Sequence, residues 1–380
     1  MSVPHAFAAN DAATLKKAVN KPVLVAGRIN QPQVAEEILA QNKADMIGVA
    51  RALIADPEFV NKFSKGNAED IRACIGCNQA CVGHRLAHYA ISCIQNPVSG
   101  RETQYPDSST AASTQSTPLV RTVVVVGGGP AGMKAAIVAA QRGHRVHLFE
   151  TTKQLGGQAL LAEKLPGRAE FGGVTTNLIH ELKQTDVQLS LCKPGDKEAL
   201  LTLDPDVVII ATGATPRLPD VEIEGIELVD SCQAIRDSSG FGQNVVIADW
   251  ACDWSGLGLA QKLAQNGHHV RLLCGGSIAG ESIQGIVRDQ WIGELHALNV
   301  EVTTYARFYG AQNDTAFFQH MTSGQPIVCE NVDTIVSCYA PRSNNHHAWL
   351  SDFAGEVHTI GDAISPRSVE EAILEGFRCA

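Results

Sequence analysis

The sequence predicts an α/β fold built on parallel sheets, and three stretches of alternating strands and helices carry this prediction. The first lies within residues 21–49, where two short apolar runs flank a helical stretch. The second begins near residue 121 and the third near residue 244, each with an apolar strand, a helix and another strand. Alternation of strands and helices is typical of parallel sheets covered by helices.

The composition is that of an ordinary globular protein. The chain has 380 residues, 44% hydrophobic and 18% charged, which is enough for two or three domains. The net charge is −10 and no basic run is present, so we expect no nucleic-acid partner. The first residues do not resemble a signal peptide and no apolar run is long enough to span a membrane, so we expect a cytoplasmic protein without a membrane partner.

The first stretch has the order strand, helix, strand. Lys21–Ile29 (KPVLVAGRI) is predicted to be a buried strand, Gln33–Gln41 a helix and Ala44–Val49 (ADMIGV) a second strand. This order predicts a parallel βαβ unit.

Both strands of this unit end in residues that suit a phosphate: Gly27, Arg28, Ala50 and Arg51. In a (β/α)8 barrel the loops after the last two strands commonly bind a phosphate, and arginine can supply the charge. Arginines that follow strands are also common as plain surface residues, so both interpretations remain open on these residues alone.

Four cysteines dominate the next segment, with the spacing C-x2-C-x3-C-x11-C: Cys74, Cys77, Cys81 and Cys93. Three thiolates in a tight turn and a fourth nearby can hold a cubane iron–sulfur cluster, although soft thiolates also suit zinc. The spacing lacks the paired C-x2-C modules of a zinc ribbon, and the segment lies between two stretches that look like flavin sites. Both points favour iron. The other seven of the 11 cysteines are scattered and are predicted to be small core residues.

Residues 104–118 (QYPDSSTAASTQSTP) are rich in Ser, Thr and Pro and are predicted to form an exposed linker. The strand Arg121–Val126 (RTVVVV) then leads into a G-x-G-x-x-G turn and the helix Met133–Arg142. Gly127 permits the tight turn, Gly129 lets the backbone approach a pyrophosphate, and Gly132 allows close packing of helix and strand. The next strand ends at Glu150, whose carboxylate can accept hydrogen bonds from ribose hydroxyls. This context predicts an adenine dinucleotide or ADP site.

Two later turns belong with that site. Gly213 follows the strand DVVII and Asp362 follows the apolar stretch that ends at Ile360. Each would lie at the carboxyl edge of the sheet, where such folds bind their ligands.

The third stretch departs from this pattern. After the strand NVVIA, the turn DWACDWSG places bulky or acidic side chains where glycines would meet a pyrophosphate, and Asp249 and Asp253 would repel phosphate. We expect this unit to keep the fold without binding NAD(P) in the usual way.

Together these pieces resemble the flavoenzymes that join an old-yellow-enzyme-like FMN barrel, a 4Fe–4S cluster and a flavin-disulfide-reductase-like domain. This is the trimethylamine dehydrogenase and 2,4-dienoyl-CoA reductase family, of which the chain matches only the C-terminal part. The resemblance rests on VAGRINQPQVAEEIL, ADMIGVARALIADPEF, IRACIGCNQAC, CIQNPVSGRE, VVVVGGGPAGMKAA, LGGQ, ATGATPR and GDA.

The resemblance implies three sets of binding residues. The 4Fe–4S cluster would bind Cys74, Cys77, Cys81 and Cys93. The phosphate of FMN would bind Gly27, Arg28, Ala50 and Arg51. The FAD, or ADP, would bind Gly127, Gly129, Gly132, Glu150, Gly157, Gln158, Gly213 and Asp362.

It also implies a domain organisation. Residues 1–55 would be the last two strands of the barrel, 56–103 the cluster segment and 104–120 the linker. Residues 121–240 and 330–380 would form the FAD or ADP domain, with a degenerate NAD(P)-like domain, 241–329, nested inside it. Because the earlier barrel strands are missing, we expect a partner chain that carries them, shares the FMN and supplies the catalytic residues.

The expected function is that of an oxidoreductase. The degenerate turn in the nested domain favours the electron-transfer part of a dehydrogenase or demethylase for methylated amines or related C–N substrates, with electrons passing from FMN to the cluster. They would then reach a carrier such as an electron-transferring flavoprotein. The C-x3-C spacing favours an NAD(P)H-dependent enoate or dienoyl-CoA reductase, and a non-catalytic scaffold subunit is a third alternative.

Overall fold

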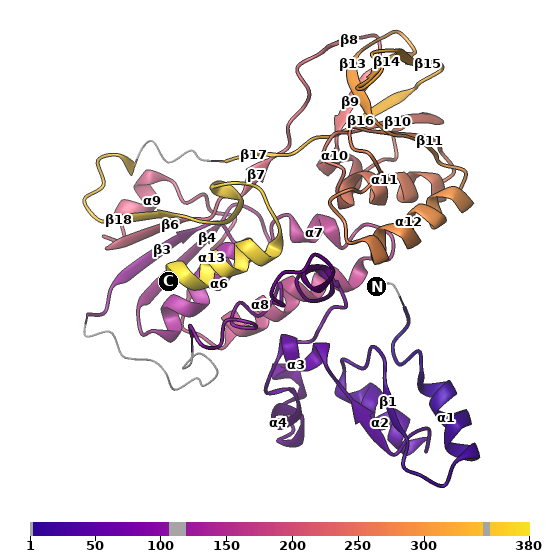
Figure 1. Cartoon of the computed structure of the whole chain (residues 1–380). Coiled ribbons are helices and arrows are strands. Elements are labelled where there is room, and N and C mark those ends of the chain that lie inside the picture. The colour runs from indigo at the N-terminus through magenta and orange to yellow at the C-terminus, as the bar shows by residue number, and fades with distance from the viewer. Residues whose placement is uncertain (1–2, 106–118, 345–349) are drawn as a thin grey trace. The chain divides into compact units, whose positions relative to one another are not determined.

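The computed structural model describes residues 3–105, 119–344 and 350–380, which form two compact units (Figure 1). The first unit comprises Met1–Ala159, Glu170–Gly213 and Asn345–Ala380, and the second comprises Leu160–Ala169 and Ala214–Asn344. The second unit is therefore inserted into the sequence of the first. Most of the expected linker lies outside the described residues. No helix of the described residues is both long and apolar enough to cross a membrane.

The N-terminal part of the first unit is the expected βαβ element. Strand β1 (Leu24–Ala26) pairs in parallel with β2 (Met46–Gly48), and α2 (Pro32–Ala40) connects them. Helix α1 (Ala9–Ala18) packs beside β1. Both strands are shorter than predicted, since just three residues of each find a partner in this sheet.

The cysteine segment contains short helices joined by irregular chain. Its elements are α3 (Arg51–Ala55), α4 (Phe59–Ser64), a 3₁₀ turn (Ala68–Asp70), a π-helical turn (Gln79–Gly83) and α5 (His84–Leu86). So little regular structure means that side chains must hold this backbone in place.

A five-stranded parallel sheet forms the rest of the first unit. Its order is β18-β6-β3-β4-β5, so strands far apart in the sequence become neighbours. The strands are β3 (Thr122–Val126), β4 (Arg145–Glu150), β5 (Gln188–Leu191), β6 (Val207–Ile210) and β18 (Glu356–Thr359). The helices are α6 (Pro130–Gln141), α7 (Ala159–Ala162, which straddles the unit boundary), α8 (Gly173–Lys183), α9 (Lys197–Leu201) and α13 (Val369–Cys379), and 3₁₀ turns occur at Ala169–Gly172, also at that boundary, and Gly361–Ala363. Helix α6 packs against both α8 and α13.

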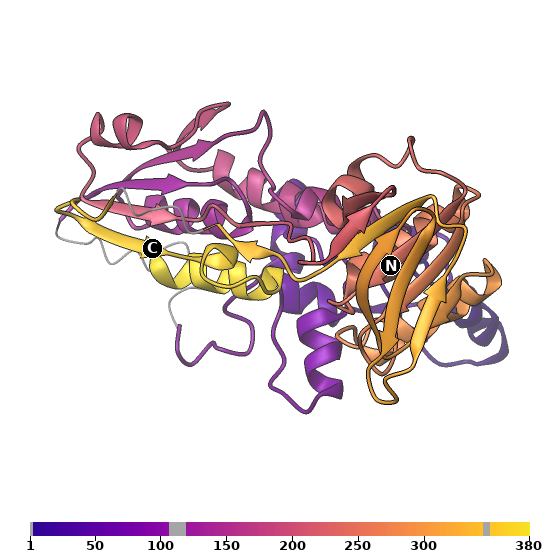
Figure 2. The same cartoon turned by 90° about the horizontal axis from the view of Figure 1, so that it is seen from above.

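The inserted unit has a second parallel sheet in the order β12-β11-β10-β16-β9 and a smaller sheet in the order β15-β14-β13-β8 (Figure 2). The first contains β9 (Glu227–Asp230), β10 (Asn244–Asp249), β11 (His269–Cys274), β12 (Glu301–Thr303) and β16 (Thr334–Cys338). The second contains β8 (Glu222–Glu224), β13 (Ala306–Gln312), β14 (Thr315–His320) and β15 (Pro326–Cys329), and β7 (Ala214–Thr215) pairs with β17 (Arg342–Ser343). The helices are α10 (Ser231–Arg236), α11 (Trp254–Gln265) and α12 (Gly285–Ala297).

The parallel α/β architecture is therefore confirmed in both larger sheets. The inserted unit is larger than the nested range 241–329, because β9 and β16 belong to its sheet. Sheet membership depends on distant pairing partners, here β10 for β16 and β16 for β9, and local sequence does not reveal them.

Candidate functional site

The turn between β3 and α6 is tightly packed on one side and open on the other. Gly127 has φ +110°, and a Cβ there would lie 2.3 Å from the carbonyl oxygen of Ala211. A Cβ at Gly132 would lie 1.9 Å from the carbonyl oxygen of Gly127. At Gly129 no described atom lies within 4 Å of the Cβ position. A pyrophosphate that approaches this turn requires such an opening.

Three further loops meet this turn at the carboxyl edge of the sheet. The N–H of Gly156 donates to the carbonyl of Gly128 (2.9 Å), which brings the loop that carries Gly157 and Gln158 beside the turn. A Cβ at Gly157 would lie 3.2 Å from the Cα of Gly129. The structure thus brings the glycines of two predicted motifs together.

The other two loops carry Gly213 and Asp362. The Gly213 loop borders Gly127 through Ala211, and the position of a Gly213 Cβ is open among the described residues. A Cβ at Gly361 would lie 2.8 Å from the Ala131 side chain, so Asp362 lies beside the start of α6. Burial raises the pKa of Asp362, although its carboxylate accepts a hydrogen bond from the N–H of Arg367 (3.1 Å).

The carboxylate of Glu150 is buried and bonded both to the glycine turn and to its own loop. One oxygen accepts from the N–H of Gly128 (2.8 Å), and the other from the N–H and hydroxyl of Thr152 (both 2.8 Å). These bonds fix the glycine turn directly. The carboxylate oxygen that contacts Gly128 retains a lone pair that a ribose hydroxyl could use.

The four residues proposed to bind FMN phosphate line one pocket in the N-terminal part. Its walls are formed by Ala26, Gly27, Arg28, Ile29, Asn30, Gly48, Ala50, Arg51, Ala52, Cys74 and Gly76. Two residues of the cysteine segment therefore belong to the same pocket as the ends of β1 and β2.

The two arginines of this pocket differ in their surroundings. Arg28 is buried, forms an ion pair with Glu170 and donates to the carbonyl of Val3, yet its Nε has no hydrogen-bond partner among the described residues. Arg51 donates to the side chain of Asn78. An unpaired, buried donor suits an anionic ligand, so these residues fit a phosphate.

The four cysteines are half-buried and lie in one neighbourhood. Burial raises the pKa of the Cys77 thiol, and the charges of Cys93, Cys81 and Cys74 raise it further. Burial likewise raises the pKa values of Cys74 and Cys93. Four thiols whose charges affect one another suit a metal centre, because a bound cation favours their thiolate forms.

These thiols lie near one another, but in the described part of the chain they are not arranged around one metal position. Within the described ranges, no group of three or more His, Cys, Asp or Glu side chains is arranged to hold a metal ion. The four thiols fit an iron–sulfur cluster by their chemistry and position.

Side chains from both neighbouring parts hold the cysteine segment. Asn30 donates to the carbonyl of Cys74, which ties the segment to the βαβ element. The carbonyl of Ala73 accepts from Gln95 (3.0 Å) and from Asn177 of α8 (3.3 Å). The segment is therefore fixed on both sides of its first cysteine.

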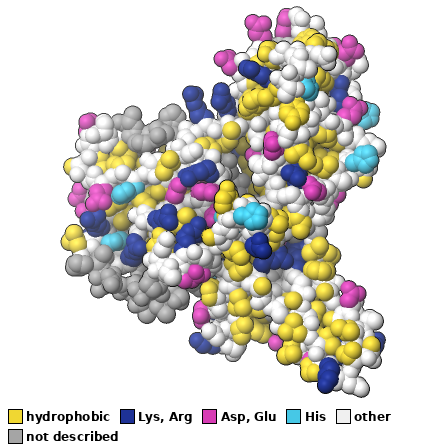
Figure 3. Space-filling model, viewed as in Figure 1, with side chains coloured by type: hydrophobic (Ala, Val, Ile, Leu, Met, Phe, Trp, Pro, Cys, Tyr) yellow, Lys and Arg dark blue, Asp and Glu magenta, His cyan; other side chains and the backbone are white. Residues whose placement is uncertain are grey.

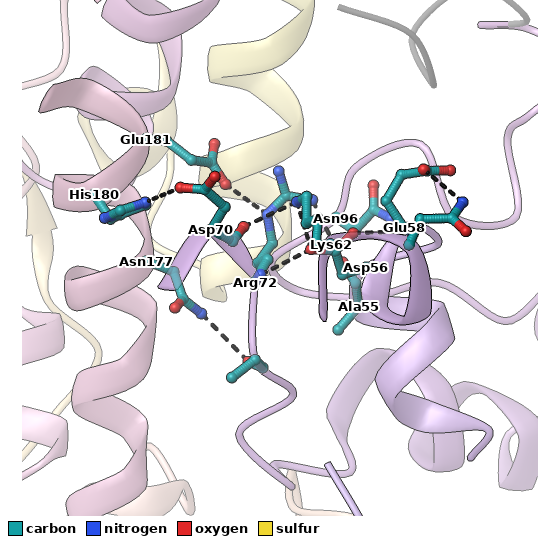
Figure 4. A network of polar contacts seen from close by, with 12 residues as sticks. Ala55, Asp56, Glu58, Lys62, Asp70, Arg72, Asn96, Asn177, His180 and Glu181 are labelled. Carbon is teal, nitrogen blue, oxygen red and sulfur yellow. Dashed lines mark hydrogen bonds and ion pairs between the residues drawn. The ribbon is translucent and has the colours of Figure 1, made fainter. Parts of the chain in front are cut away.

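A buried ion network strengthens this junction. Arg72 donates to Glu181 of α8 (2.6 Å; Figure 4). Lys134 of α6 donates to the other oxygen of the same carboxylate (2.9 Å). Burial opposes ionisation of Glu181, but Arg72 and Lys134 outweigh it and lower its pKa to about 2. No sequence pattern predicts this network. Its one visible signal is Lys134, a cation in the otherwise apolar helix sequence PAGMKAAIVAA.

The turn of the inserted unit is occupied by its own side chains. Asp249 is 1% exposed, and burial raises its pKa well above the ordinary value. Asp253 accepts from the N–H of Ser255 (2.8 Å) and caps α11. Trp250 is 41% exposed and stacks on Tyr339, with ring centroids 6.2 Å apart. The two aspartates therefore act in the packing and capping of this turn.

One prediction about the remaining cysteines is wrong. Cys192 is exposed, at φ +54°, and Cys232 and Cys379 are half-buried, so these three are not core residues. Cys252, Cys274, Cys329 and Cys338 are buried as predicted.

A glycine turn at the carboxyl edge of one parallel sheet, with a second parallel α/β unit inserted after it, defines the class of two-unit flavin and pyridine-nucleotide oxidoreductases. Residues 121–346 match the family model "Pyridine nucleotide-disulphide oxidoreductase", and residues 3–70 match the "NADH:flavin oxidoreductase / NADH oxidase family". The chain belongs to the pyridine nucleotide-disulphide oxidoreductase family.

Known relatives confirm the expected kinship. The chain is 32% identical to an NADH oxidase of Thermoanaerobacter brockii over 96% of this chain and 56% of that protein. It is 34% identical to an N,N-dimethylglycine/sarcosine dehydrogenase of Chromohalobacter salexigens over 80% of this chain and 44% of that protein. The structure of 2-naphthoyl-CoA reductase with 2-naphthoyl-CoA matches with a TM-score of 0.89 and 27% identity, covering 99% of this chain and 56% of that one. The chain thus spans about half the length of these relatives.

Proposed function

We propose that this chain is the electron-transfer part of an iron–sulfur flavoprotein dehydrogenase that acts on methylated amines or related C–N substrates. The observation that carries the proposal is the pocket at the ends of β1 and β2, because Cys74 and Gly76 line it together with Gly27, Arg28 and Arg51. A flavin phosphate bound there would lie beside the cysteine segment. A bound 4Fe–4S cluster would accept and pass on single electrons.

In this proposal the residues of the chain have separate tasks. Arg28 and Arg51 hold the phosphate of FMN, and the four thiolates of the 74–93 segment hold the cluster. Glu150 fixes the glycine turn, and the opening at Gly129 admits the pyrophosphate of FAD or ADP. Arg72, Glu181 and Lys134 keep the cysteine segment against α6 and α8.

The inserted unit favours a dehydrogenase over an enzyme fed by a pyridine nucleotide. Asp253 stands at the N-cap of α11, where the first unit has Gly129 at the N-cap of α6, so an acidic side chain replaces the open glycine position. The Trp250 side chain of the same turn is 41% exposed and stacks on Tyr339. A turn with an acidic side chain at this position leaves a pyrophosphate neither room nor favourable charge. The sarcosine dehydrogenase relative is consistent with this choice.

The second candidate is an NAD(P)H-dependent reductase of enoates or related thioesters. It is favoured by the NADH oxidase relative and by the structural match to 2-naphthoyl-CoA reductase. Titration of the flavin-loaded protein with NADH and NADPH under anaerobic conditions distinguishes the two. We expect neither nucleotide to bleach the flavin. Rapid bleaching by either one would favour the reductase.

We also propose that the complete FMN site needs the remaining barrel strands, supplied by a partner chain or by another segment. The described part of the βαβ element provides two strands, and Leu24 and Met46 leave apolar side chains exposed there. Flavin analysis of the chain expressed alone tests this point. We expect adenine nucleotide without stoichiometric FMN, and a stable monomer with stoichiometric FMN that oxidises an amine would contradict it.

A further inference from the structure

Two cysteines of the inserted unit meet at the carboxyl edge of its parallel sheet. Cys274 is the last residue of β11 and pairs in register with Asp249, the last residue of β10. Cys252 lies in the turn that follows β10, where its N–H donates to the Asp249 carboxylate (2.9 Å). The N–H of Gly276, two residues after Cys274, donates to the sulfur of Cys252 (3.2 Å). The turn therefore places one thiol beside the other.

The surroundings activate one of the two thiols. The Cys274 thiol hydrogen-bonds to Cys252 and lowers its pKa to about 7, although burial and the charge of Glu281 oppose this. The N–H groups of Gly276 and Gly275 also stabilise the Cys252 thiolate. Hydrogen bonding to Cys252 raises the pKa of Cys274. Such a thiolate–thiol pair is typical of cysteines that react with oxidants.

This pair is separate from the sites described above. Cys252 is 6% exposed and Cys274 is fully buried, both within the core of the inserted unit. Neither belongs to the 74–93 segment or to the glycine turn after β3. Because Cys252 is only slightly exposed, a small oxidant can reach it more readily than a bulky disulfide can.

We propose that Cys252 and Cys274 form an oxidisable dithiol that becomes a disulfide when a hydroperoxide reaches this edge of the sheet. The Cys252 thiolate attacks one oxygen of the peroxide and the O–O bond breaks, so that Cys252 becomes a sulfenic acid. The other oxygen leaves with a proton from solvent, as an alcohol or, from hydrogen peroxide, as water. Cys274 then attacks that sulfur, the S–O bond breaks, and the proton of Cys274 leaves with the hydroxide as water. With hydrogen peroxide, the two thiols are oxidised and the peroxide is reduced to water.

The disulfide would join the turn before α11 to the end of β11. These two segments lie at the carboxyl edge of the sheet, where folds of this kind bind their ligands. Oxidation would fix the turn in place, and the disulfide would persist in the unit until it is reduced. This inference does not depend on the proposed activity.

Peptide mapping of the whole protein tests the proposal. The purified protein is treated with a small excess of hydrogen peroxide, its free thiols are blocked with N-ethylmaleimide, and it is digested without reduction. We expect one cross-linked peptide that joins the Cys252 and Cys274 segments and disappears on reduction. In C274S, we expect the sulfenic acid of Cys252 to persist and to react with dimedone.

Cys329 provides the matched control. It is buried in the same unit, and burial raises its pKa, so C329S should leave the cross-link unchanged. The proposal is overturned if the wild-type protein gives no Cys252–Cys274 peptide while the exposed Cys192 is oxidised. It is equally overturned if dimedone labels no Cys252 in C274S.

Discussion

Gly129 and Gly132 stand in the same turn, but a side chain would meet different surroundings at each. A valine at 132 would collide with the carbonyl of Gly127, whereas a valine at 129 would enter open space. We therefore expect G129V to fold normally and to lose bound adenine nucleotide, because its side chain fills the approach of the pyrophosphate. We expect G132V to lose the nucleotide too and, unlike G129V, to have a lower melting temperature.

Heat releases the bound nucleotide, and chromatography quantifies it. Circular dichroism melts give the melting temperature. If G129V retains its full content of adenine nucleotide, the dinucleotide site lies elsewhere.

Glu181 gives the first unit a specific dependence on pH. Its pKa falls from an ordinary 4.5 to about 2 in the folded protein. A lowered pKa means that the carboxylate stabilises the fold above about pH 4.5, and that this stability is lost as the pH falls toward 2. Replacing the carboxylate by an amide also leaves Arg72 and Lys134 without a counter-charge. We expect E181Q to lose about 3 kcal/mol at neutral pH, the usual cost of breaking a buried ion pair.

Denaturant unfolding between pH 3 and pH 7 measures this effect, and E181Q should show a flatter pH profile than the wild type. The control is E356Q, which removes an exposed ion pair with Arg121 and should change little. Identical pH profiles for E181Q and the wild type would show that another group carries the dependence.

The glycine pattern predicted the tight turn between β3 and α6, because such a turn requires residues without a Cβ. It did not reveal that Glu150 would be bonded to Gly128 and Thr152, or that Asp249 would be buried. The bond from Gly128 to Glu150 forms only when two separate loops meet, and the burial of Asp249 depends on the elements packed around it. A sequence pattern indicates which residue types are present, but it does not supply the tertiary contacts that orient them.

The two-stranded sheet of the βαβ element leaves apolar side chains uncovered. Leu24 is 56% exposed and Met46 is 49% exposed, and apolar side chains gather on this part of the molecule (Figure 3). Exposed apolar side chains on a two-stranded sheet mark a surface that another element covers. We expect the chain alone to bind the dye ANS and to self-associate, and the L24S/M46S variant to do both less.

Fluorescence titration and size-exclusion chromatography test this expectation. L218S is the control, since Leu218 is 48% exposed but lies in the inserted unit. Equal dye binding and equal association for all three proteins would show that the β1–β2 surface is not a docking surface.

The longer strands were predicted to within a residue or two, because continuous apolar runs such as VVVV mark buried parallel strands. The three-stranded antiparallel part of the smaller sheet, β13–β15, was not predicted. Its strands alternate buried and exposed residues over short stretches, and the polar residues among them obscure the pattern. The α13 helix was also missed, although Ser368 and Glu371 form a capping box that marks its start.

In the whole molecule, the two large parallel sheets differ in the turn that follows β3 in one and β10 in the other. The first has Gly129 at the N-cap of α6, with open space at its Cβ position, and the second has the acidic side chain of Asp253 at the N-cap of α11. The sequence predicted this contrast, because the two turns can be compared directly. It did not predict the extent of the inserted unit, which depends on the pairing of β9 and β16.

We propose that the 74–93 segment holds a 4Fe–4S cluster beside a flavin site. The most direct measurement is the iron and acid-labile sulfide content of the anaerobically purified protein, for the wild type and for C77A. We predict about four of each per wild-type chain, and loss of both together with the broad visible absorption in C77A. Stoichiometric zinc without sulfide in the wild-type protein would show that the segment does not hold a 4Fe–4S cluster.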